Sequence, residues 1–186
     1  MSKNWALIGV IVVVVILGIS AVSGYNSLVT LNENVNGKWS QVENQLQRRA
    51  DLIPNLVETV KGAAAQERQL IQSVTDARAK LGGAQGPAAK AAANDELSGA
   101  LSRLLVVVEN YPNMKTDQNF RQLTDELAGT ENRLAVARKD YNDSVQIYNT
   151  KIRTFPSSIY ASMLGFGPKE YFRAAESAKE TPKVKF

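Results

Sequence analysis

The sequence predicts an all-α protein in which one N-terminal transmembrane helix precedes an antiparallel helical bundle. Three observations carry this prediction: a long uncharged run near the start, apolar residues that recur every three or four positions afterwards, and glycines and prolines that separate the periodic stretches. The alternation of apolar and polar residues that is typical of a strand does not occur outside the apolar run. We expect three long helices and a short C-terminal one, arranged much like a four-helix bundle.

The uncharged run covers residues 4–32, and residues 5–22 are apolar apart from two glycines and one serine. About 18 such residues form a helix that is long enough to cross the hydrocarbon core of a bilayer. We therefore assign residues 1–24 to a membrane anchor, with residues 5–22 in contact with lipid. Residues 25–178 are assigned to a helical bundle domain and residues 179–186 to a disordered tail.

Two other interpretations of this run are a cleaved secretory signal and an ordinary buried helix. Ala21 and Ser23 would supply the small residues before a cleavage near Gly24. An uncleaved anchor is favoured because the run is longer than the apolar part of most signals and is apolar on every side. Lys3 precedes the run and the first positive charge after it is Lys38, so the positive-inside rule places the N-terminus in the cytoplasm and the domain outside it.

The first predicted helix of the bundle begins near Asn32 or Asn34, either of which could cap it, and ends near Leu81. Its apolar positions step by three and four over several heptads, as in a coiled coil, and Glu67 and Arg78 fill the two gaps. This stripe consists of Val35, Trp39, Val42, Leu46, Ala50, Ile53, Val57, Val60, Ala64, Ile71, Val74 and Leu81. A helix of this length would extend beyond its neighbours and leave part of the stripe available to a second copy or to the bilayer surface.

Pro54 lies inside this stripe and removes one backbone donor from the helix. Because the apolar pattern keeps its phase across the proline, we expect a kink rather than a break. The neighbouring side chains of Arg48, Arg49, Asp51 and Asn55 could satisfy the freed backbone groups. The glycines after the helix follow a helix rather than a strand and lack a Gly-Lys-Ser/Thr sequence, so they predict a mobile turn and not a phosphate site.

Further periodic segments complete the predicted bundle. Their predicted bounds are residues 88–109, residues 116 or 117 to 156, and a shorter amphipathic segment at residues 157–166. The Tyr-Pro-Asn sequence at residues 111–113 stops the first of these, and Pro156 stops the second. We also expect a last turn or two within residues 169–178.

The composition excludes several classes of function. The chain has no cysteine and no histidine, so it has no thiolate chemistry, no zinc-type ligand set and no ordinary base at neutral pH. Its net charge of +4 is spread out, without the run of like charges that is typical of a nucleic-acid-binding tail. We therefore predict no enzymatic activity, no catalytic residue, no cofactor, no metal site and no nucleic-acid partner.

Many stretches after the anchor match the motifs of one known family. They are Tyr-Asn-Ser-Leu-Val (25–29), Lys-Trp-Ser-Gln-Val and Gln-Leu-Gln-Arg-Arg (38–49), Asp-Leu-Ile-Pro-Asn-Leu-Val-Glu (51–58), Val-Lys-Gly (60–62), Glu-Asn-Tyr-Pro-Asn-Met-Lys (109–115), Phe-Arg-Gln-Leu (120–123), Glu-Leu-Ala-Gly-Thr-Glu-Asn-Arg (126–133), Ala-Arg-Lys-Asp-Tyr-Asn (137–142), Tyr-Asn-Thr (148–150) and Phe-Pro-Ser (155–157). On these motifs the chain resembles the LemA family.

This resemblance implies a bacterial protein with an N-terminal membrane segment, an antiparallel helical bundle and no known enzymatic activity. Combined with the predicted orientation, it implies a single-pass protein of the inner membrane with an extracytoplasmic domain. Some members are linked to membrane remodelling or to neighbouring membrane metalloproteases. Others resemble lipoproteins, whose cysteine this chain lacks.

Charged residues within the stripes could form either an anion site or ion pairs between helices. Arg48 and Arg49, together with Asp51 and Glu58, are the candidates. We favour ion pairs with carboxylates of the last long helix, which would fix the register of the bundle. The predicted carboxylate partners are Glu126, Glu131 and Asp140.

The aromatic residues divide between the core and the predicted membrane interface. Trp39, Tyr141 and Tyr148 fall on the apolar stripes, which favours core packing over a ligand pocket. Tyr25 follows the apolar run directly, where amphipathic rings favour the bilayer interface. Three apolar residues near the end of the bundle could either dip into lipid or complete the core of a neighbour: Met163, Leu164 and Phe166.

Three functional hypotheses remain. The favoured one is a membrane-anchored helical module of the cell envelope that assembles with copies of itself through its long first helix and its anchor. The second is an adaptor that regulates a membrane protease or another envelope enzyme. The third is a membrane-remodelling scaffold that presses the segment at residues 157–166 onto lipid.

Overall fold

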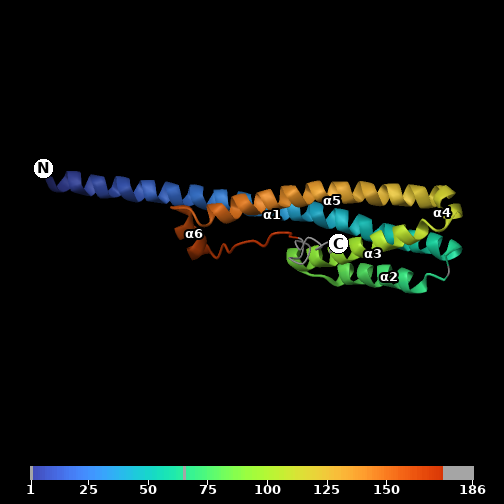
Figure 1. Cartoon of the computed structure of the whole chain (residues 1–186). Helices are drawn as coiled ribbons and strands as arrows, with labels where there is room; N and C mark the ends of the chain where they lie inside the picture. Colours follow the sequence, from blue (N-terminus) through green and yellow to red (C-terminus); the bar gives the residue numbers. More distant parts are fainter. Residues whose placement is uncertain (1, 65, 174–186) are drawn as a thin grey trace, which may run out of the picture. The chain divides into compact units, whose positions relative to one another are not determined.

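Six α-helices make up the described part of the chain, which is residues 2–64 and 66–173 of a computed structural model, and no strand occurs in it (Figure 1). Their bounds are α1 Ser2–Ala63, α2 Arg68–Gly83, α3 Gly86–Val108, α4 Pro112–Thr116, α5 Gln118–Lys151 and α6 Ser157–Leu164. The prediction of an all-α fold, with a long apolar N-terminal helix followed by a helical bundle, is confirmed.

The chain divides into two compact units, and α1 and α5 contribute residues to both. The anchor unit consists of residues 1–38 and 143–169, and the bundle unit consists of residues 39–142 and 170–186. No helix end marks the predicted boundary after residue 24, because α1 passes through it. The assignment of separate anchor, bundle and tail domains stays a prediction.

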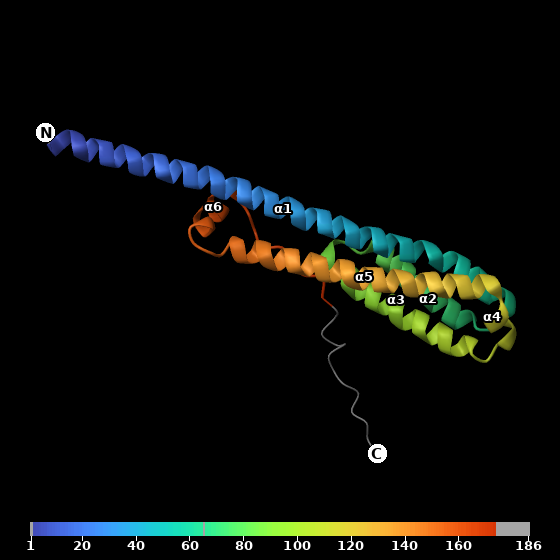
Figure 2. The same cartoon turned by 90° about the horizontal axis from the view of Figure 1, so that it is seen from above.

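α1 is a single helix of 62 residues that starts much earlier than the sequence suggests (Figure 2). The predicted start at Asn32 or Asn34 is wrong, because the uncharged run and the apolar stripe belong to one helix. The stretch between the two, residues 24–34, contains one glycine and no proline. Nothing in it therefore stops the helix, and an asparagine cap has no role there.

The predicted continuation of this helix to Leu81 is also wrong, because α1 ends at Ala63 and the chain resumes as α2 at Arg68. Apolar residues on both sides of the interruption are buried, for example Val60 and Val74. A spacing of three and four satisfies two helices as well as one, so periodicity alone does not reveal the break.

A contact between residues far apart in sequence holds the junction of α1 and α2. The hydroxyl of Tyr111 donates a hydrogen bond of 3.1 Å to Oε1 of Glu67, the residue before α2. Glu67 occupies a gap in the apolar stripe because it lies at this junction and not on the face of a continuous helix. The spacing of residues along the chain does not predict a hydrogen-bond partner that lies 44 positions away.

Pro54 lies within α1 without ending it, as expected. A proline at this position leaves the carbonyl oxygen of Ala50 without its helical donor. Nε of Arg78 in α2 donates a hydrogen bond of 2.8 Å to that oxygen. The donor is therefore Arg78, the residue that fills the second gap of the stripe, and the prediction that side chains next to the proline take this role is wrong.

The remaining helices largely follow the sequence. α3 begins at Gly86, whose positive φ of 77° suits a glycine, and Pro87 occupies its first turn. Oδ1 of Asp117 accepts a hydrogen bond of 2.8 Å from the backbone of Phe120, so Asp117 caps the start of α5. The short helix α4, which follows Tyr111, was not predicted.

α5 ends at Lys151, earlier than the predicted end at Pro156. A residue before a proline avoids the helical conformation, and the backbone amide of Arg153 already bonds in a tighter turn to the carbonyl of Thr150. α6 lies within the predicted segment 157–166 and ends at Leu164, and Gly165, which follows it, adopts φ 76°. Residues 169–173 are not helical, so the turn predicted within residues 169–178 does not form in that part. Residues 174–178 and the predicted tail at 179–186 lie outside the described residues.

The apolar stripe becomes the core of the protein. Nearly all its members are buried: Val35, Val42, Leu46, Ala50, Ile53, Val57, Val60, Ala64, Ile71, Val74 and Leu81. Trp39 is partly buried, and its ring lies 5.2 Å from that of Tyr141. Tyr141 and Tyr148 are buried as predicted. Because the chain buries this stripe itself, the apolar surface that α1 leaves exposed is its N-terminal run.

Candidate functional site

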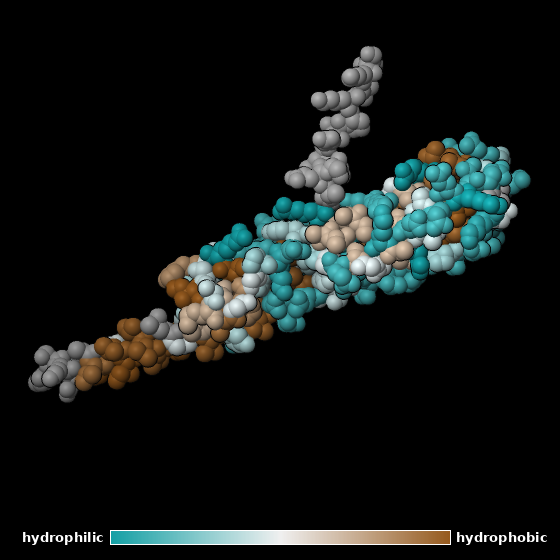
Figure 3. Space-filling model, turned by 90° about the horizontal axis from the view of Figure 1, so that it is seen from below, coloured by the Kyte–Doolittle hydropathy of each residue, from teal (hydrophilic) through white to brown (hydrophobic). Residues whose placement is uncertain are grey.

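The first candidate surface is the N-terminal part of α1, where the large apolar side chains that the structure describes from Trp5 to Val22 are exposed. Its most hydrophobic 18-residue window has a mean hydropathy of 2.8, and none of that window is buried. On the face that Figure 3 shows, hydrophobic residues, in brown, gather along this end of α1. By length and composition this helix is able to cross a membrane.

α6 packs against α1 directly after this run, within the anchor unit. A Cβ atom on Gly24 would stand 3.0 Å from Cδ2 of Tyr160, so the glycine allows the tyrosine ring to lie against the backbone of α1. The rings of Tyr25 and Phe166 meet edge to face, with their centroids 6.2 Å apart. These two contacts tie α6 and the residues after it to the end of the apolar run.

The face of α6 that points away from this contact is apolar and exposed. Ser157 and Ala161 are buried, whereas three large side chains are 50–79% exposed and Phe155 just before the helix is 82% exposed. The three are Ile159, Met163 and Leu164. Met163 and Leu164 are therefore not part of the chain's own core. The two roles considered from the sequence, contact with lipid and completion of a neighbour's core, both remain open to them.

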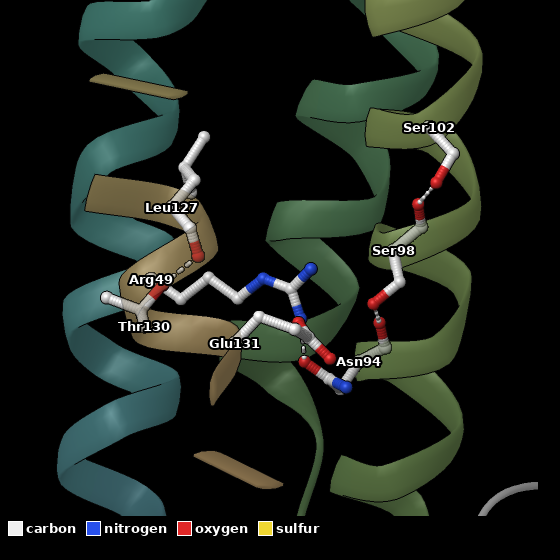
Figure 4. A network of polar contacts seen from close by, with 7 residues as sticks. All are labelled: Arg49, Asn94, Ser98, Ser102, Leu127, Thr130 and Glu131. Carbon is white, nitrogen blue, oxygen red and sulfur yellow. Dashed lines mark hydrogen bonds and ion pairs between the residues drawn. The ribbon is translucent and has the colours of Figure 1, made fainter. Parts of the chain in front are cut away.

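A buried arginine links three helices of the bundle unit (Figure 4). Arg49 of α1 is only 5% exposed, and its Nη1 donates a hydrogen bond of 2.7 Å to Oδ1 of Asn94 in α3. The same nitrogen lies 2.5 Å from Oε2 of Glu131 in α5. Ser98 and Ser102 continue the polar row along α3 by donating to the carbonyls one turn earlier.

The buried position of Arg49 disfavours the charged form of its guanidinium. Burial lowers the pKa of its guanidinium, and the carboxylates of Glu131 and Asp95 partly oppose this shift. Its Nε is buried without a hydrogen-bond partner. A charge held in this way contributes little net stability, and Arg49 meets both Asn94 of α3 and Glu131 of α5 in the observed alignment of the three helices.

Two of the three predicted carboxylate partners on the last long helix, Glu126 and Glu131, form the expected ion pairs. Arg48 pairs with Glu126 at 3.2 Å and Arg49 with Glu131. The other two candidates have local partners: Asp51 accepts a hydrogen bond from Gln47 and Glu58 pairs with Lys61. The favoured interpretation of these residues as register-fixing pairs is the one that the contacts support.

Two Tyr-Asn pairs on α5 hold the chain that follows α6, and sequence reasoning missed their role. In the anchor unit, Tyr148 donates a hydrogen bond to the carbonyl of Gly167, and Asn149 both donates to the carbonyl of Lys169 and accepts from its amide. An asparagine that bonds both backbone groups of one residue fixes an extended chain much as a neighbouring strand would.

The second pair repeats this arrangement in the bundle unit. Tyr141 donates to the carbonyl of Glu170, and Asn142 bonds both the carbonyl and the amide of Phe172. The ring of Phe172 is buried, 6.3 Å from that of Trp39. The signal that would have revealed these residues is the recurrence of Tyr-Asn after seven positions, a spacing that returns to the same helix face.

The described residues offer little for catalysis or ligand binding. They contain no group of three or more carboxylates that could hold a metal ion. The groove lined by the most charged residues has a volume of about 620 Å³, and Arg48, Arg121, Arg133, Asp125 and Glu126 line it. Arg48 and Glu126 already pair with each other, so the groove presents a mixed charged surface and not a built anion site.

These features define a class of protein: an all-α bundle that carries one helix long and apolar enough to span a membrane. Within this class, the chain belongs to the LemA family, whose pattern matches residues 38–186. The resemblance seen in the sequence motifs is thereby confirmed.

Relatives of the chain include magnetosome proteins. Magnetosome protein MamQ 1 of Paramagnetospirillum magneticum is 30% identical over 184 residues, which cover 85% of this chain and 67% of the relative. Magnetosome protein MamQ of Magnetospirillum gryphiswaldense shows the same identity and coverage. Protein LemA of Metamycoplasma hominis is 23% identical over 155 residues, covering 81% of this chain and 69% of the relative.

Proposed function

We propose that this chain is a membrane-anchored, non-enzymatic interaction module of the bacterial cell envelope that assembles with copies of itself. The observation that carries this proposal is the exposed apolar run at residues 5–22, which continues as the same helix into the bundle without a linker. In water such a run would be left without any apolar partner, whereas in a bilayer it is solvated by lipid. The bundle then stands on the extracytoplasmic side, as the positive-inside rule indicates.

A non-enzymatic role is supported by composition and by relationship. The chain contains neither histidine nor cysteine, and the names of its relatives are not those of enzymes. The buried polar side chains of Arg49, Asn94 and Asn149 bond to another side chain or to backbone. Such groups stabilise a fold without presenting a reactive atom to a substrate.

Self-assembly is proposed to use the anchor, because the stripe of α1 is already buried by its own chain. Gly9 and Gly18 lie in the apolar run and have no other atom within 4 Å of the position a Cβ would take. Small residues of this kind let membrane helices approach each other closely.

Membrane insertion and topology are tested together on the full-length chain. After cell breakage, we expect the protein to stay in the membrane pellet through an alkaline carbonate wash. Because the chain has no cysteine, a single Val136→Cys variant at an exposed bundle position gives a clean label site. A membrane-impermeant maleimide added to spheroplasts should label it, and labelling only after lysis would reverse the proposed orientation.

Assembly is tested by the mass of the detergent-extracted protein. We expect light scattering behind a sizing column to show a dimer or a larger species that dissociates on dilution. A Gly18→Ile variant is matched by Gly37→Ile, which lies in α1 after the apolar run. The pair separates packing in the membrane from general effects on the helix. A monomer at every concentration would contradict the proposed self-assembly, but it would not contradict the proposed membrane anchor.

A second candidate, membrane remodelling, is favoured by one observation, the exposed apolar face of α6. Amphipathic segments that insert shallowly expand one leaflet and bend it. Liposomes densely covered with the full-length protein would be expected to form tubules or smaller vesicles in electron micrographs. Unchanged spherical vesicles at high coverage would argue against this role.

A further inference from the structure

We propose that α6, together with Phe155, lies in the headgroup region of the same bilayer that α1 enters, so that each copy grips the membrane surface a second time. This inference rests on the proposed function, since it needs residues 5–22 to be in lipid. The partner is a lipid surface. It is reached by the exposed side chains of Phe155, Ile159, Met163 and Leu164.

The position of α6 along α1 is the first argument. Eighteen residues of helix, from Trp5 to Val22, span about 27 Å at 1.5 Å per residue, close to the hydrocarbon thickness of about 30 Å. Tyr160 packs on Gly24, two residues after the run ends. Two further residues add about 3 Å along the helix, which places this contact at the headgroup level. Tyr25, 45% exposed beside it, is the residue type that membrane interfaces favour.

The chemistry of the segment is the second argument. Residues 154–168 contain no charged side chain, whereas Arg153 precedes the segment and Lys169 follows it. An uncharged segment that is flanked by cations suits an interface in which acyl chains lie below anionic headgroups. Its inward face is already occupied, because Ser157 and Ala161 are buried. The outward face has no described partner within the chain.

The anchoring of the segment is the third argument, and it favours lipid over a second copy. The contacts of Tyr160 with Gly24 and of Phe166 with Tyr25 fix α6 to the helix that enters the bilayer. Every membrane-inserted copy therefore presents this face to lipid, whatever its oligomeric state. A stable protein interface usually buries about 800 Å² on each partner, more than four exposed side chains provide.

Site-specific fluorescence in vesicles tests the proposal on the full-length chain. Single cysteines at Met163 and Ile159 are labelled with an environment-sensitive nitrobenzoxadiazole dye, and the variants are reconstituted into vesicles of phosphatidylcholine and phosphatidylglycerol at 3:1. Val106→Cys and Val136→Cys are matched controls, because both are apolar, similarly exposed and part of the bundle unit. Val13→Cys reports on the membrane span itself.

Lipids that carry a nitroxide quencher at a shallow or a deep acyl position then report the depth of each dye. We expect the dye at Met163→Cys and Ile159→Cys to be quenched at least threefold more than at the two controls, and more by the shallow quencher than by the deep one. The dye at Val13→Cys should respond most to the deep quencher.

The possible failures are distinguishable. If Val13→Cys is quenched but Met163→Cys behaves like Val136→Cys, the membrane anchor stands and this inference is overturned. If the dye at Met163→Cys is shielded from both lipid and aqueous quenchers, and the unlabelled Met163→Cys variant forms disulfide-linked dimers under mild oxidation, the occupant of the face is a second copy, and the inference is again overturned. If Val13→Cys itself escapes lipid quenching, the proposed membrane anchoring fails.

Discussion

The anchor unit and the bundle unit both bury a tight apolar core, yet they leave different side chains exposed. The bundle unit exposes few large apolar residues, Leu105, Val106 and Val136, and carries ion pairs such as Lys80–Glu96 on its surface. The anchor unit exposes all the large apolar side chains that the structure describes in the run at residues 5–22, and four further ones around α6. Only the second distribution forms a continuous apolar surface.

This difference shows how to interpret exposure in a helical protein. Single exposed apolar residues are normal in water-soluble proteins and call for no explanation. A contiguous series needs a partner, because the free energy of leaving it in water grows with its area. The same residue type, valine, is therefore expected to behave oppositely in the two units when it is made polar.

The largest expected effect is on membrane association. In a Val13→Arg/Ile16→Arg variant, each charge near the helix centre should cost about 2.5–3.5 kcal/mol of insertion free energy. We expect much of the protein to leave the carbonate-resistant membrane fraction, as measured by immunoblotting of fractions. Val106→Arg is the matched control, at which an exposed valine of the bundle unit changes stability by less than about 0.5 kcal/mol. Equal membrane retention of both variants would contradict the contrast between the units.

The next effect concerns the proline of α1. Arg78→Met removes the donor to the carbonyl of Ala50 and should lower the free energy of unfolding by about 1.5–3 kcal/mol, the usual contribution of a hydrogen bond from a charged group. Guanidinium denaturation in a mild detergent, followed by circular dichroism, measures this loss. Arg78→Lys keeps a donor at this position and should lose less.

A double-mutant cycle shows whether Arg78 compensates specifically for Pro54. In a Pro54→Ala background the backbone amide of residue 54 is restored and can bond to Ala50 itself. Arg78→Met should then cost at least about 1 kcal/mol less than it does beside the proline. An identical cost in both backgrounds would mean that the two residues act independently.

The sequence predicts the fold class, the core positions and the partners of Arg48 and Arg49, because helical periodicity records which face of each helix is buried. Prediction from the sequence fails where two arrangements of helices share the same periodicity. The break between Ala63 and Arg68 leaves the stripe in phase, and a donor for Ala50 that comes from 28 positions away has no local signature. The role of the Tyr-Asn pairs is missed for another reason. Their partners are backbone groups, which every residue supplies, so the sequence does not identify them.

The two Tyr-Asn pairs allow the same substitution to be compared in both units. Asn142→Ala and Asn149→Ala each remove two hydrogen bonds to backbone and should each cost about 1–2 kcal/mol of stability. Hydrogen exchange resolves them: the first should speed exchange at the amide of Phe172, and the second at that of Lys169. Asn119→Ala, at an exposed position in the first turn of α5, should change neither. Faster exchange at both amides in either variant would show that the contacts of the two Tyr-Asn pairs open together.

The smallest effect is a dependence on alkaline pH. Burial, with a smaller contribution from the carboxylate of Glu170, raises the pKa of Tyr141 from 10.0 to about 12. Between these values the folded state keeps a proton that the unfolded state has lost, so the free energy of unfolding falls as the pH rises from about 10 to about 12. Tyr141→Phe should cost about 0.5–1.5 kcal/mol at neutral pH, through its lost hydrogen bond to Glu170, and should show a shallower decline above pH 10. Denaturation midpoints of both proteins across this range measure the difference, and parallel curves would mean that Tyr141 ionises as readily in the folded protein as in the unfolded one.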